Sequence, residues 1–199
     1  MRLILASKSP RRREILTMLG VPFEIVSADA PEVIPPGADA CAAVQAISAQ
    51  KAAAAQALLQ KTEGDDPHRI VLGADTVVAI DGEILGKPRD RAHAAQMLRR
   101  LSGRAHSVYT GLTLLQGEKR FTRAEETRVF FRELTEEEIT AYVASGETDD
   151  KAGAYALQGK GGVFVQRAEG DFFNVIGLPA QLLYTMLQQH CGVSLAAYF

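Results

Sequence analysis

The chain has 199 residues and 47% of them are hydrophobic, which is enough to bury a substantial core as one domain or as one domain with a further lobe. Lysine and arginine number 22 against 24 aspartates and glutamates, and the net charge of −2 argues against a nucleic-acid-binding surface. The two cysteines and four histidines lack metal-ligand spacing, and no run of about 18 apolar residues is present. We therefore expect a cytoplasmic protein with reduced thiols and with neither a nucleic-acid nor a membrane partner.

The N-terminal segment combines a strand pattern with a helix pattern. The apolar run "RLILA" (residues 2–6) predicts a buried strand. The next segment, residues 9–20, reads "SPRRREILTMLG" and has the signals of a complete helix. Ser9 can cap its start, Pro10 suits its first position, and Gly20 can end it in a left-handed conformation.

Three consecutive arginines, Arg11, Arg12 and Arg13, fall in the first turn of this predicted helix. A helix N-terminus already carries partial positive charge and free N–H groups, so cations there are unfavourable unless an anion shares the site. The cluster therefore indicates an anion-binding position. A helical turn directs one of the three, Arg13, toward solvent.

The rest of the chain alternates strand and helix patterns. Further strands are expected at residues 22–28, 69–80, 106–116 and 120–134, and strand character resumes across 163–179. Further helices are expected at roughly 40–59, 89–101 and 135–145, and from Pro179 to near Cys191. A glycine-rich segment, 149–162, lies between them. This order predicts a mixed α/β fold with one twisted sheet flanked by helices.

Polar residues in unusual settings mark candidate chemistry. Asp75 interrupts an apolar run, where an unpaired carboxylate is costly to bury, although a strand-end Asp alone is commonly a turn cap. Thr76 follows it directly, and Lys87 comes after a short hairpin that can fold back beside it. Lys51 and Glu32, taken singly, suit a solvated helix face and an exposed loop. Considered together, the cations and carboxylates suit a phosphoanhydride substrate and a hard divalent ion.

Signatures of common nucleotide folds and of serine hydrolases are missing from the sequence. Instead the chain resembles the Maf family of nucleoside triphosphate pyrophosphatases over nearly its whole length. The resemblance rests on these motifs, in order: "LASKSPRRREIL", "GVPFEIV", "VLGADTVV", "GEILGKPRD", "LSGRAHSVYTG", "YVASGETDDKAGAYALQGKGG" and "GDFFNVIGLP".

The resemblance implies a single domain over residues 1–199, with a central twisted mixed sheet flanked by helices and two lobes about a cleft, similar to inosine triphosphate pyrophosphatases. It also implies hydrolysis of a nucleoside triphosphate to the monophosphate and pyrophosphate, assisted by a divalent cation, Mg²⁺ or Mn²⁺. A homodimer is expected on the same grounds.

The resemblance further assigns roles to residues. Asp75 matches the family's proposed general base, and Arg12, Lys51 and Lys87 join it as catalytic positions. The metal is expected at Glu32 and Asp75. Such roles are chemically reasonable, because a carboxylate near a metal-bound water can take its proton.

Substrate binding is expected at five positions: Ser7, Arg11, Arg12, Thr76 and Gln158. Arg11, Thr76 and Gln158 match the subgroup that is selective for dTTP and UTP. The amide of Gln158 offers a donor and an acceptor to a uracil or thymine edge. Two alternatives stay open: an enzyme for modified nucleotides, and a non-catalytic nucleotide-binding regulator of cell division.

Overall fold

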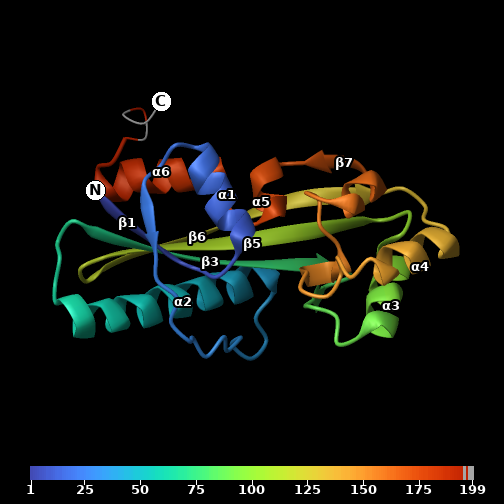
Figure 1. Ribbon diagram of the computed structural model, residues 1–199, viewed down its shortest axis with the longest axis horizontal. Coiled ribbons are helices and arrows are strands. Elements are labelled where there is room, and N and C mark those ends of the chain that lie inside the picture. The colour runs from blue at the N-terminus through green and yellow to red at the C-terminus, as the bar shows by residue number, and fades with distance from the viewer. Residues whose placement is uncertain (195, 197–199) are drawn as a thin grey trace.

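The computed structural model describes residues 1–194 and 196, and its centre is a seven-stranded mixed sheet (Figure 1). The strands run in the order β2-β1-β3-β5-β6-β7, and β4 pairs with β3 off this path. β1 is parallel to both of its neighbours, and the other pairs are antiparallel. The strands are β1 (Arg2–Ala6), β2 (Phe23–Ile25), β3 (Arg69–Ile80), β4 (Glu83–Leu85), β5 (Ala105–Gln116), β6 (Lys119–Phe131) and β7 (Val165–Glu169).

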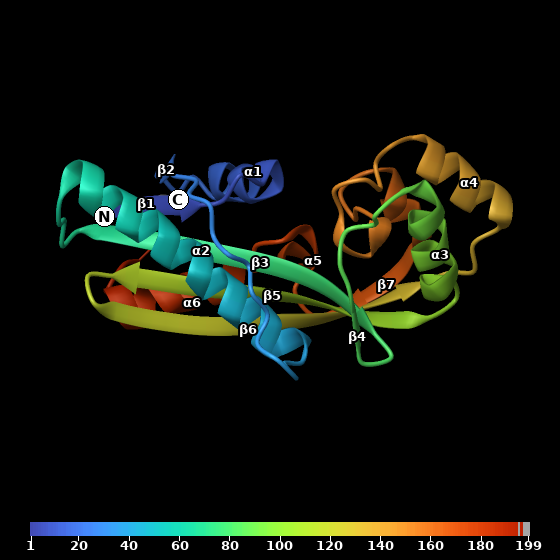
Figure 2. The same cartoon turned by 90° about the horizontal axis from the view of Figure 1, so that it is seen from below.

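Helices cover both faces of the sheet and one of its ends. The helices are α1 (Pro10–Met18), α2 (Ala40–Glu63), α3 (Arg91–Leu101), α4 (Glu136–Ala144), α5 (Phe172–Ile176) and α6 (Ala180–Cys191), with two 3₁₀ turns, η1 (Ala152–Ala154) and η2 (Lys160–Phe164). α2 lies along one face, α1, α5 and α6 lie over the other, and α3 and α4 gather at the far end (Figures 1 and 2). No helix among the described residues combines the length and the hydropathy that a membrane-spanning segment needs.

Two glycines allow α2 to approach the sheet closely. A Cβ added at Gly73 of β3 would lie 2.1 Å from the carbonyl oxygen of Ser48, and one at Gly111 of β5 would lie 2.3 Å from that of Val44. Any side chain at either position would therefore push the helix away. This close packing brings the middle of α2 beside the polar part of β3.

The core is divided between the two ends of the long strands. One cluster of buried residues includes Leu72 of β3 and Leu112 of β5, and packs against α1 and α6. A second cluster includes Val78 and Val108 of the same two strands, and packs against α3 and α4. Two lobes thus share β3 and β5, and the residues between the two clusters lie where the lobes meet (Figure 2). The expected mixed α/β architecture is confirmed.

Most of the predicted elements are present. Gly20 has a φ of 67° and ends α1 as expected, and the short hairpin expected before Lys87 turns at Asp81 and Gly82, whose φ values are 56° and 75°. Thr135 and Glu138 form a capping box at the start of α4, where the sequence predicts a helix from residue 135. Ser9 lies at the N-cap of α1, but its side chain makes no capping hydrogen bond.

The prediction of strand character across 163–179 is wrong for most of that range. Only Val165–Glu169 forms a strand, and Phe172–Ile176 forms α5. The Asp171 carboxylate accepts hydrogen bonds from the backbone N–H groups of Phe173 (2.7 Å) and Asn174 (3.3 Å), which caps this short helix. The cap outweighs the β propensity of the apolar residues. The strand predicted at 22–28 is shorter, at Phe23–Ile25.

Candidate active site

A pocket of about 750 Å³ opens between the two lobes, and every predicted site residue lines it. The residues come from seven separate segments of the chain: the β1–α1 connection, α1, the loop after β2, α2, β3, the segment after β4, and the glycine-rich segment after α4. The set is Ser7, Arg11, Arg12, Glu32, Lys51, Asp75, Thr76, Lys87 and Gln158.

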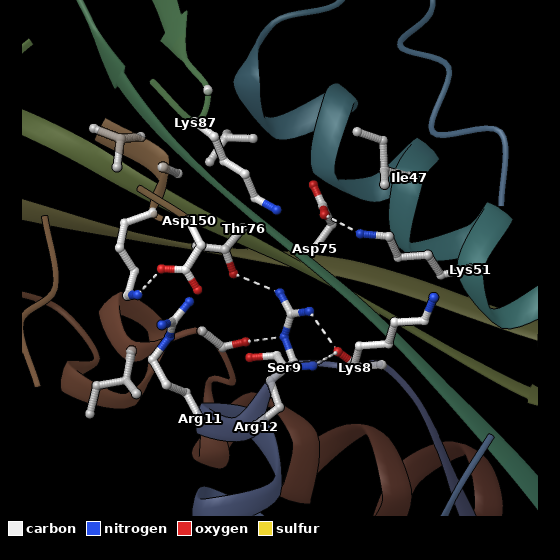
Figure 3. Close-up of a pocket in the computed structure, with 18 of the residues that line it drawn as sticks. Lys8, Ser9, Arg11, Arg12, Ile47, Lys51, Asp75, Thr76, Lys87 and Asp150 are labelled. Atoms are coloured by element: carbon white, nitrogen blue, oxygen red, sulfur yellow. Dashed lines mark hydrogen bonds and ion pairs between the residues drawn. The ribbon is translucent and has the colours of Figure 1, made fainter. Parts of the chain in front are cut away.

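The centre of the pocket is an ion pair between α2 and β3. Lys51 Nζ lies 2.7 Å from Asp75 Oδ1 (Figure 3). The same nitrogen lies 3.1 Å from Glu32 Oε1. The Lys51 and Asp75 side chains are 17% and 14% exposed, whereas Glu32 is 58% exposed. One lysine thus joins a sheltered carboxylate on the sheet to a solvent-facing carboxylate on the loop. Asp75 is not the turn cap that its sequence position alone favours.

Arg12 reaches the pocket from α1 and is buried. Its guanidinium donates three hydrogen bonds, all to uncharged oxygens: Nε to Gly177 O at 2.8 Å, Nη1 to Ser7 Oγ at 3.1 Å and Nη2 to Thr76 Oγ1 at 3.1 Å. Among the described residues, no carboxylate forms an ion pair with it. Burial lowers the pKa of Arg12 from 12.5 to about 10, so the side chain remains charged at neutral pH.

A directed chain of hydroxyl groups supports Arg12. Thr76 Oγ1 accepts from Arg12 and lies 2.9 Å from Thr110 Oγ1, and Thr110 Oγ1 in turn donates to the carbonyl oxygen of Asn174 at 3.0 Å. Because the Thr110 hydrogen goes to Asn174, Thr76 donates to Thr110 and has one lone pair left for a ligand. Thr76 and Thr110 are register partners on β3 and β5, so the sheet fixes this chain.

Asp150 is a pocket residue that the sequence argument did not single out. It lies beside Arg11 and hydrogen-bonds to Lys151 (Figure 3). Burial raises the pKa of Asp150, but the Lys151 hydrogen bond and the charges of Lys151 and Arg11 outweigh it and lower the pKa below 3.8. The available signal was its place at the start of the glycine-rich segment 149–162, "DDKAGAYALQGKGG".

Lys87 and Gln158 lie on the exposed rim of the pocket. Lys87 follows Gly86, whose carbonyl oxygen accepts from Gly153 N at 3.1 Å, so the segments that carry the two rim residues are tied together. The Glu147 carboxylate accepts from the backbone N–H groups just after Gln158, those of residues 160 and 161, at 3.1 and 3.2 Å. The glycine-rich segment is therefore anchored at both ends.

Positive charge predominates in the pocket although the whole chain has a net charge of −2. The lining cations are Lys8, Arg11, Arg12, Lys51, Lys87 and Lys151, and the lining anions are Asp29, Glu32, Asp75 and Asp150. This excess, together with a buried arginine that has only neutral acceptors, fits a polyanionic ligand.

Comparison with known proteins agrees with the motifs. The family model described as Maf-like protein matches residues 2–190. The chain belongs to this family. The matched range contains every residue that lines the pocket.

Curated relatives of this Maf-like chain share about half of its residues. A protein of Bacillus anthracis named dTTP/UTP pyrophosphatase is 48% identical over 188 residues, covering 94% of this chain and 95% of the relative. Proteins with the same name from Bacillus cereus and Bacillus cytotoxicus are also 48% identical, with 94% of this chain covered in each case. Among solved structures, the Ham1 protein of Staphylococcus aureus is 14% identical, with a TM-score of 0.48 over 100% of this chain and 93% of that one.

Proposed function

We propose that the chain hydrolyses dTTP and UTP to the nucleoside monophosphate and pyrophosphate. The observation that carries this proposal is the pocket: nine residues matched to the family motifs, from seven segments, surround one cavity around the Lys51–Asp75 pair. The name dTTP/UTP pyrophosphatase of the 48%-identical relatives supports the substrate pair.

Asp75 acts as the general base in this scheme. A water molecule attacks the α-phosphorus, its proton passes to the carboxylate, and the bond to the bridging oxygen breaks so that pyrophosphate leaves. Asp75 Oδ1 receives the Lys51 hydrogen bond, and we assign the proton to Oδ2. The Lys51 contact orients the carboxylate, which general-base catalysis requires.

The cations hold the triphosphate and stabilise the charge that develops on the leaving group. Arg12 is preorganised by three hydrogen bonds and contributes a fixed cation that pairs with no carboxylate of the described residues. Lys51 lies beside the base, and Lys87 closes the site from the rim. Preorganised charge of this kind acts on the transition state without reorganisation during the reaction.

A divalent cation, Mg²⁺ or Mn²⁺, is the proposed cofactor. Among the described residues, no group of three or more His, Cys, Asp or Glu side chains is placed to hold a metal by itself. Mg²⁺ usually binds through one or two carboxylates together with substrate phosphates. The carboxylates of Asp75 and Glu32, which both lie beside Lys51, fit that pattern. When bound, the ion would polarise phosphoryl oxygens and neutralise part of their charge.

The pyrimidine base is proposed to lie at the rim, near Arg11 and Gln158. The side chain of Gln158 is exposed, and its amide can pair with both a donor and an acceptor of uracil or thymine. Thr76 adds one acceptor lone pair while its hydrogen is engaged with Thr110. Ser7 contributes by orienting Arg12.

The test is the isosteric substitution Asp75→Asn. We expect kcat for pyrophosphate release from dTTP and UTP to fall about 10³-fold, because an amide cannot accept the proton. Pyrophosphate release is measured with Mg²⁺ and with Mn²⁺, using the full panel of nucleoside triphosphates on the wild-type chain.

The control is Asp65→Asn, at an exposed residue outside the pocket that accepts a hydrogen bond from Gln60. Its activity should equal that of the wild type. Turnover by Asp75→Asn at the wild-type rate would remove the proposed base. Tight triphosphate binding by the wild type without any pyrophosphate release would replace the proposed enzyme with a nucleotide-binding regulator.

A further inference from the structure

The loop between β2 and α2 carries Glu32 in an uncommon backbone conformation. Glu32 has a φ of 50°, one of three non-glycine residues with positive φ among those described. Left-handed conformations are unfavourable for residues with a Cβ and persist only when surrounding contacts impose them. Some contact must therefore hold this loop.

Gln50 of α2 supplies that contact. Its side-chain oxygen accepts from the backbone N–H of Val33 at 2.9 Å, and its side-chain nitrogen donates to the backbone carbonyl of Val33 at 2.7 Å. The amide thus satisfies both backbone groups of one loop residue, as a paired strand would. This two-point contact fixes the orientation of the peptide groups on both sides of Val33.

The two contacts between loop and helix are in register. Val33 follows Glu32, and Gln50 precedes Lys51, so the backbone clamp and the Glu32–Lys51 ion pair are adjacent. Successive helical residues point about 100° apart, which lets Gln50 face the loop while Lys51 faces Asp75. Moving the clamp by one residue would take the Glu32 carboxylate away from Lys51.

Other described contacts of this loop are weaker or lie elsewhere. The ion pair of Asp29 with Lys8 is 3.7 Å long between exposed side chains, and Ala38 N donates to Pro35 O within the loop. Asp39 caps α2 through Ala42 N, after the loop has ended. The hydrogen bonds of Gln50 to Val33 are therefore the shortest described polar contacts between this loop and α2.

We propose that Gln50 is a positioning residue for catalysis, which holds Glu32 in the strained conformation that places its carboxylate beside Lys51 and Asp75. The inference rests on the proposed function of the pocket for its kinetic consequence. Gln50 does not contact the reacting groups itself and acts through the neighbouring residue.

The test compares matched substitutions on one helix. Gln50→Met keeps side-chain length and helix propensity but removes both hydrogen bonds to Val33. Gln56→Met is the matched control, because Gln56 donates a side-chain hydrogen bond to the carbonyl of Gly117, away from the pocket. We expect kcat/KM of Gln50→Met to fall about tenfold and its half-saturating Mg²⁺ concentration to rise, with neither change in Gln56→Met.

A double-mutant cycle with Glu32→Gln separates positioning from general stabilisation. If Gln50 acts through Glu32, the double variant Glu32→Gln/Gln50→Met has the same kcat/KM as Glu32→Gln alone. An additional tenfold loss in the double variant would overturn the inference. So would a Gln50→Met variant with the kinetics and Mg²⁺ dependence of Gln56→Met.

A second measurement does not depend on activity. The loop contains no lysine or arginine between residues 26 and 39, but it contains Glu32, where a glutamate-specific protease can cut. We expect faster cleavage at Glu32 in Gln50→Met than in the wild type or Gln56→Met. Equal cleavage rates in the wild type, Gln50→Met and Gln56→Met would show that Gln50 does not hold the loop. A wild-type chain that releases no pyrophosphate but shows this protease pattern would refute the proposed function and retain the clamp.

Discussion

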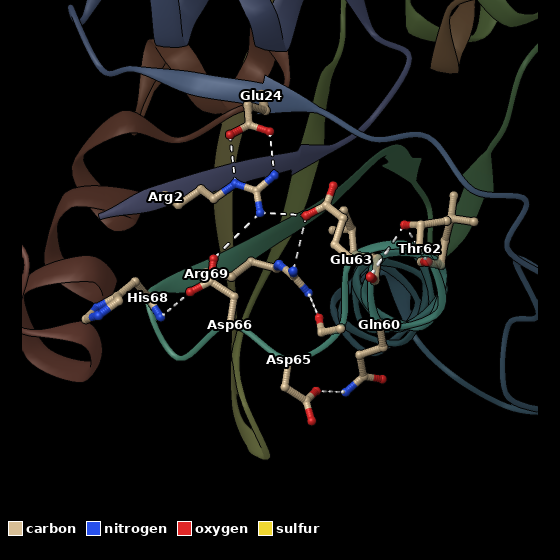
Figure 4. A network of polar contacts seen from close by, with 12 residues as sticks. Arg2, Glu24, Gln60, Thr62, Glu63, Asp65, Asp66, His68 and Arg69 are labelled. Atoms are coloured by element: carbon tan, nitrogen blue, oxygen red, sulfur yellow. Dashed lines mark hydrogen bonds and ion pairs between the residues drawn. The ribbon is translucent and has the colours of Figure 1, made fainter.

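Arginines hold two regions of this molecule together in opposite ways. At the end of the sheet where β1 begins, Arg2 pairs with Glu24 at 2.8 Å and with Glu63 at 2.6 Å, joining β1, β2 and α2 (Figure 4). In the pocket, Arg12 is more deeply buried and bonds only to uncharged oxygens (Figure 3). The first region has carboxylates for its cations, and the second has none for Arg12 within the described chain.

The pKa values express the same contrast. Hydrogen bonds to Glu24 and Glu63 raise the pKa of Arg2, whereas burial lowers that of Arg12 to about 10. Keeping the charge on Arg12 therefore costs free energy in the protein without a ligand. A cation kept at such a cost, in a cationic pocket and at the start of a helix, fits a site completed by an anion. This explains the arginine run that conflicts with the helix dipole.

The largest effect expected from this contrast is in Arg12→Met. We expect kcat/KM for dTTP to fall about 10³-fold, because the fixed cation is lost. The free energy of unfolding without nucleotide should change by less than about 1 kcal/mol, because relief from burying a charge offsets the lost hydrogen bonds. Steady-state kinetics measures the change in kcat/KM, and urea unfolding measures the change in the free energy of unfolding.

Nucleotide should also stabilise the wild type far more than this variant. Added dTTP without metal is expected to raise the Tm of the wild type, since a ligand stabilises the state that binds it, and to leave that of Arg12→Met nearly unchanged. Equal stabilisation of both would mean that Arg12 does not bind the triphosphate. A large loss of stability in the free variant would make Arg12 a structural residue like Arg2.

A buried histidine, His106, extends the comparison to the lobe formed by α3 and α4. His106 Nε2 lies 2.8 Å from Tyr155 Oη, and its Nδ1 is buried without a described partner. Burial lowers the pKa of His106 to about 4. Between about pH 4 and pH 6.5 the unfolded chain binds a proton that the folded chain does not, so acid destabilises the fold.

This histidine should contribute about 3 kcal/mol to the loss of stability on going from pH 7 to pH 4, and its contribution levels off below pH 4. The glutamine in His106→Gln does not titrate between pH 7 and pH 4. The free energy of unfolding of this variant should therefore fall by about 3 kcal/mol less than that of the wild type over the same interval. Unfolding by urea at pH 7, 5 and 4 measures the difference. Parallel curves for the two proteins would show that the pKa of His106 is the same in the folded and the unfolded chain.

The sequence predicted the residues that line the candidate site more fully than it predicted the contacts among them. Arg12 and Asp75 could be predicted because each violates a local rule, a cation at a helix start and a carboxylate in an apolar run. Asp150 and Gln50 violate none and went unnoticed. Their importance depends on contacts with Arg11 and Val33, which lie far away in sequence.

The fold shows the same difference between features that local sequence predicts and features that depend on distant contacts. Long periodic segments such as β3 and α2 were predictable, because their residues agree locally with their structure. Residues 172–176 were expected to be extended and are helical, because the Asp171 cap and the contacts of Asn174 in the core decide the outcome. The amide of Asn174 donates to Val108 O at 2.9 Å, a tertiary contact that no local pattern contains.

The smallest expected effect concerns the region in which arginines pair with carboxylates. Arg69, at the start of β3, is 4% exposed and donates to Gly64 O at 3.1 Å and to Glu63 Oε2 at 3.3 Å. Arg69→Met keeps an unbranched apolar stem but leaves both acceptors without this donor. We expect the free energy of unfolding to fall by about 1–2 kcal/mol, and kcat/KM to stay unchanged because the pocket lies further along β3. A variant with normal stability but impaired turnover would contradict the structural role of Arg69. An arginine paired with a carboxylate would then serve catalysis, and the contrast with Arg12 would no longer separate the two regions.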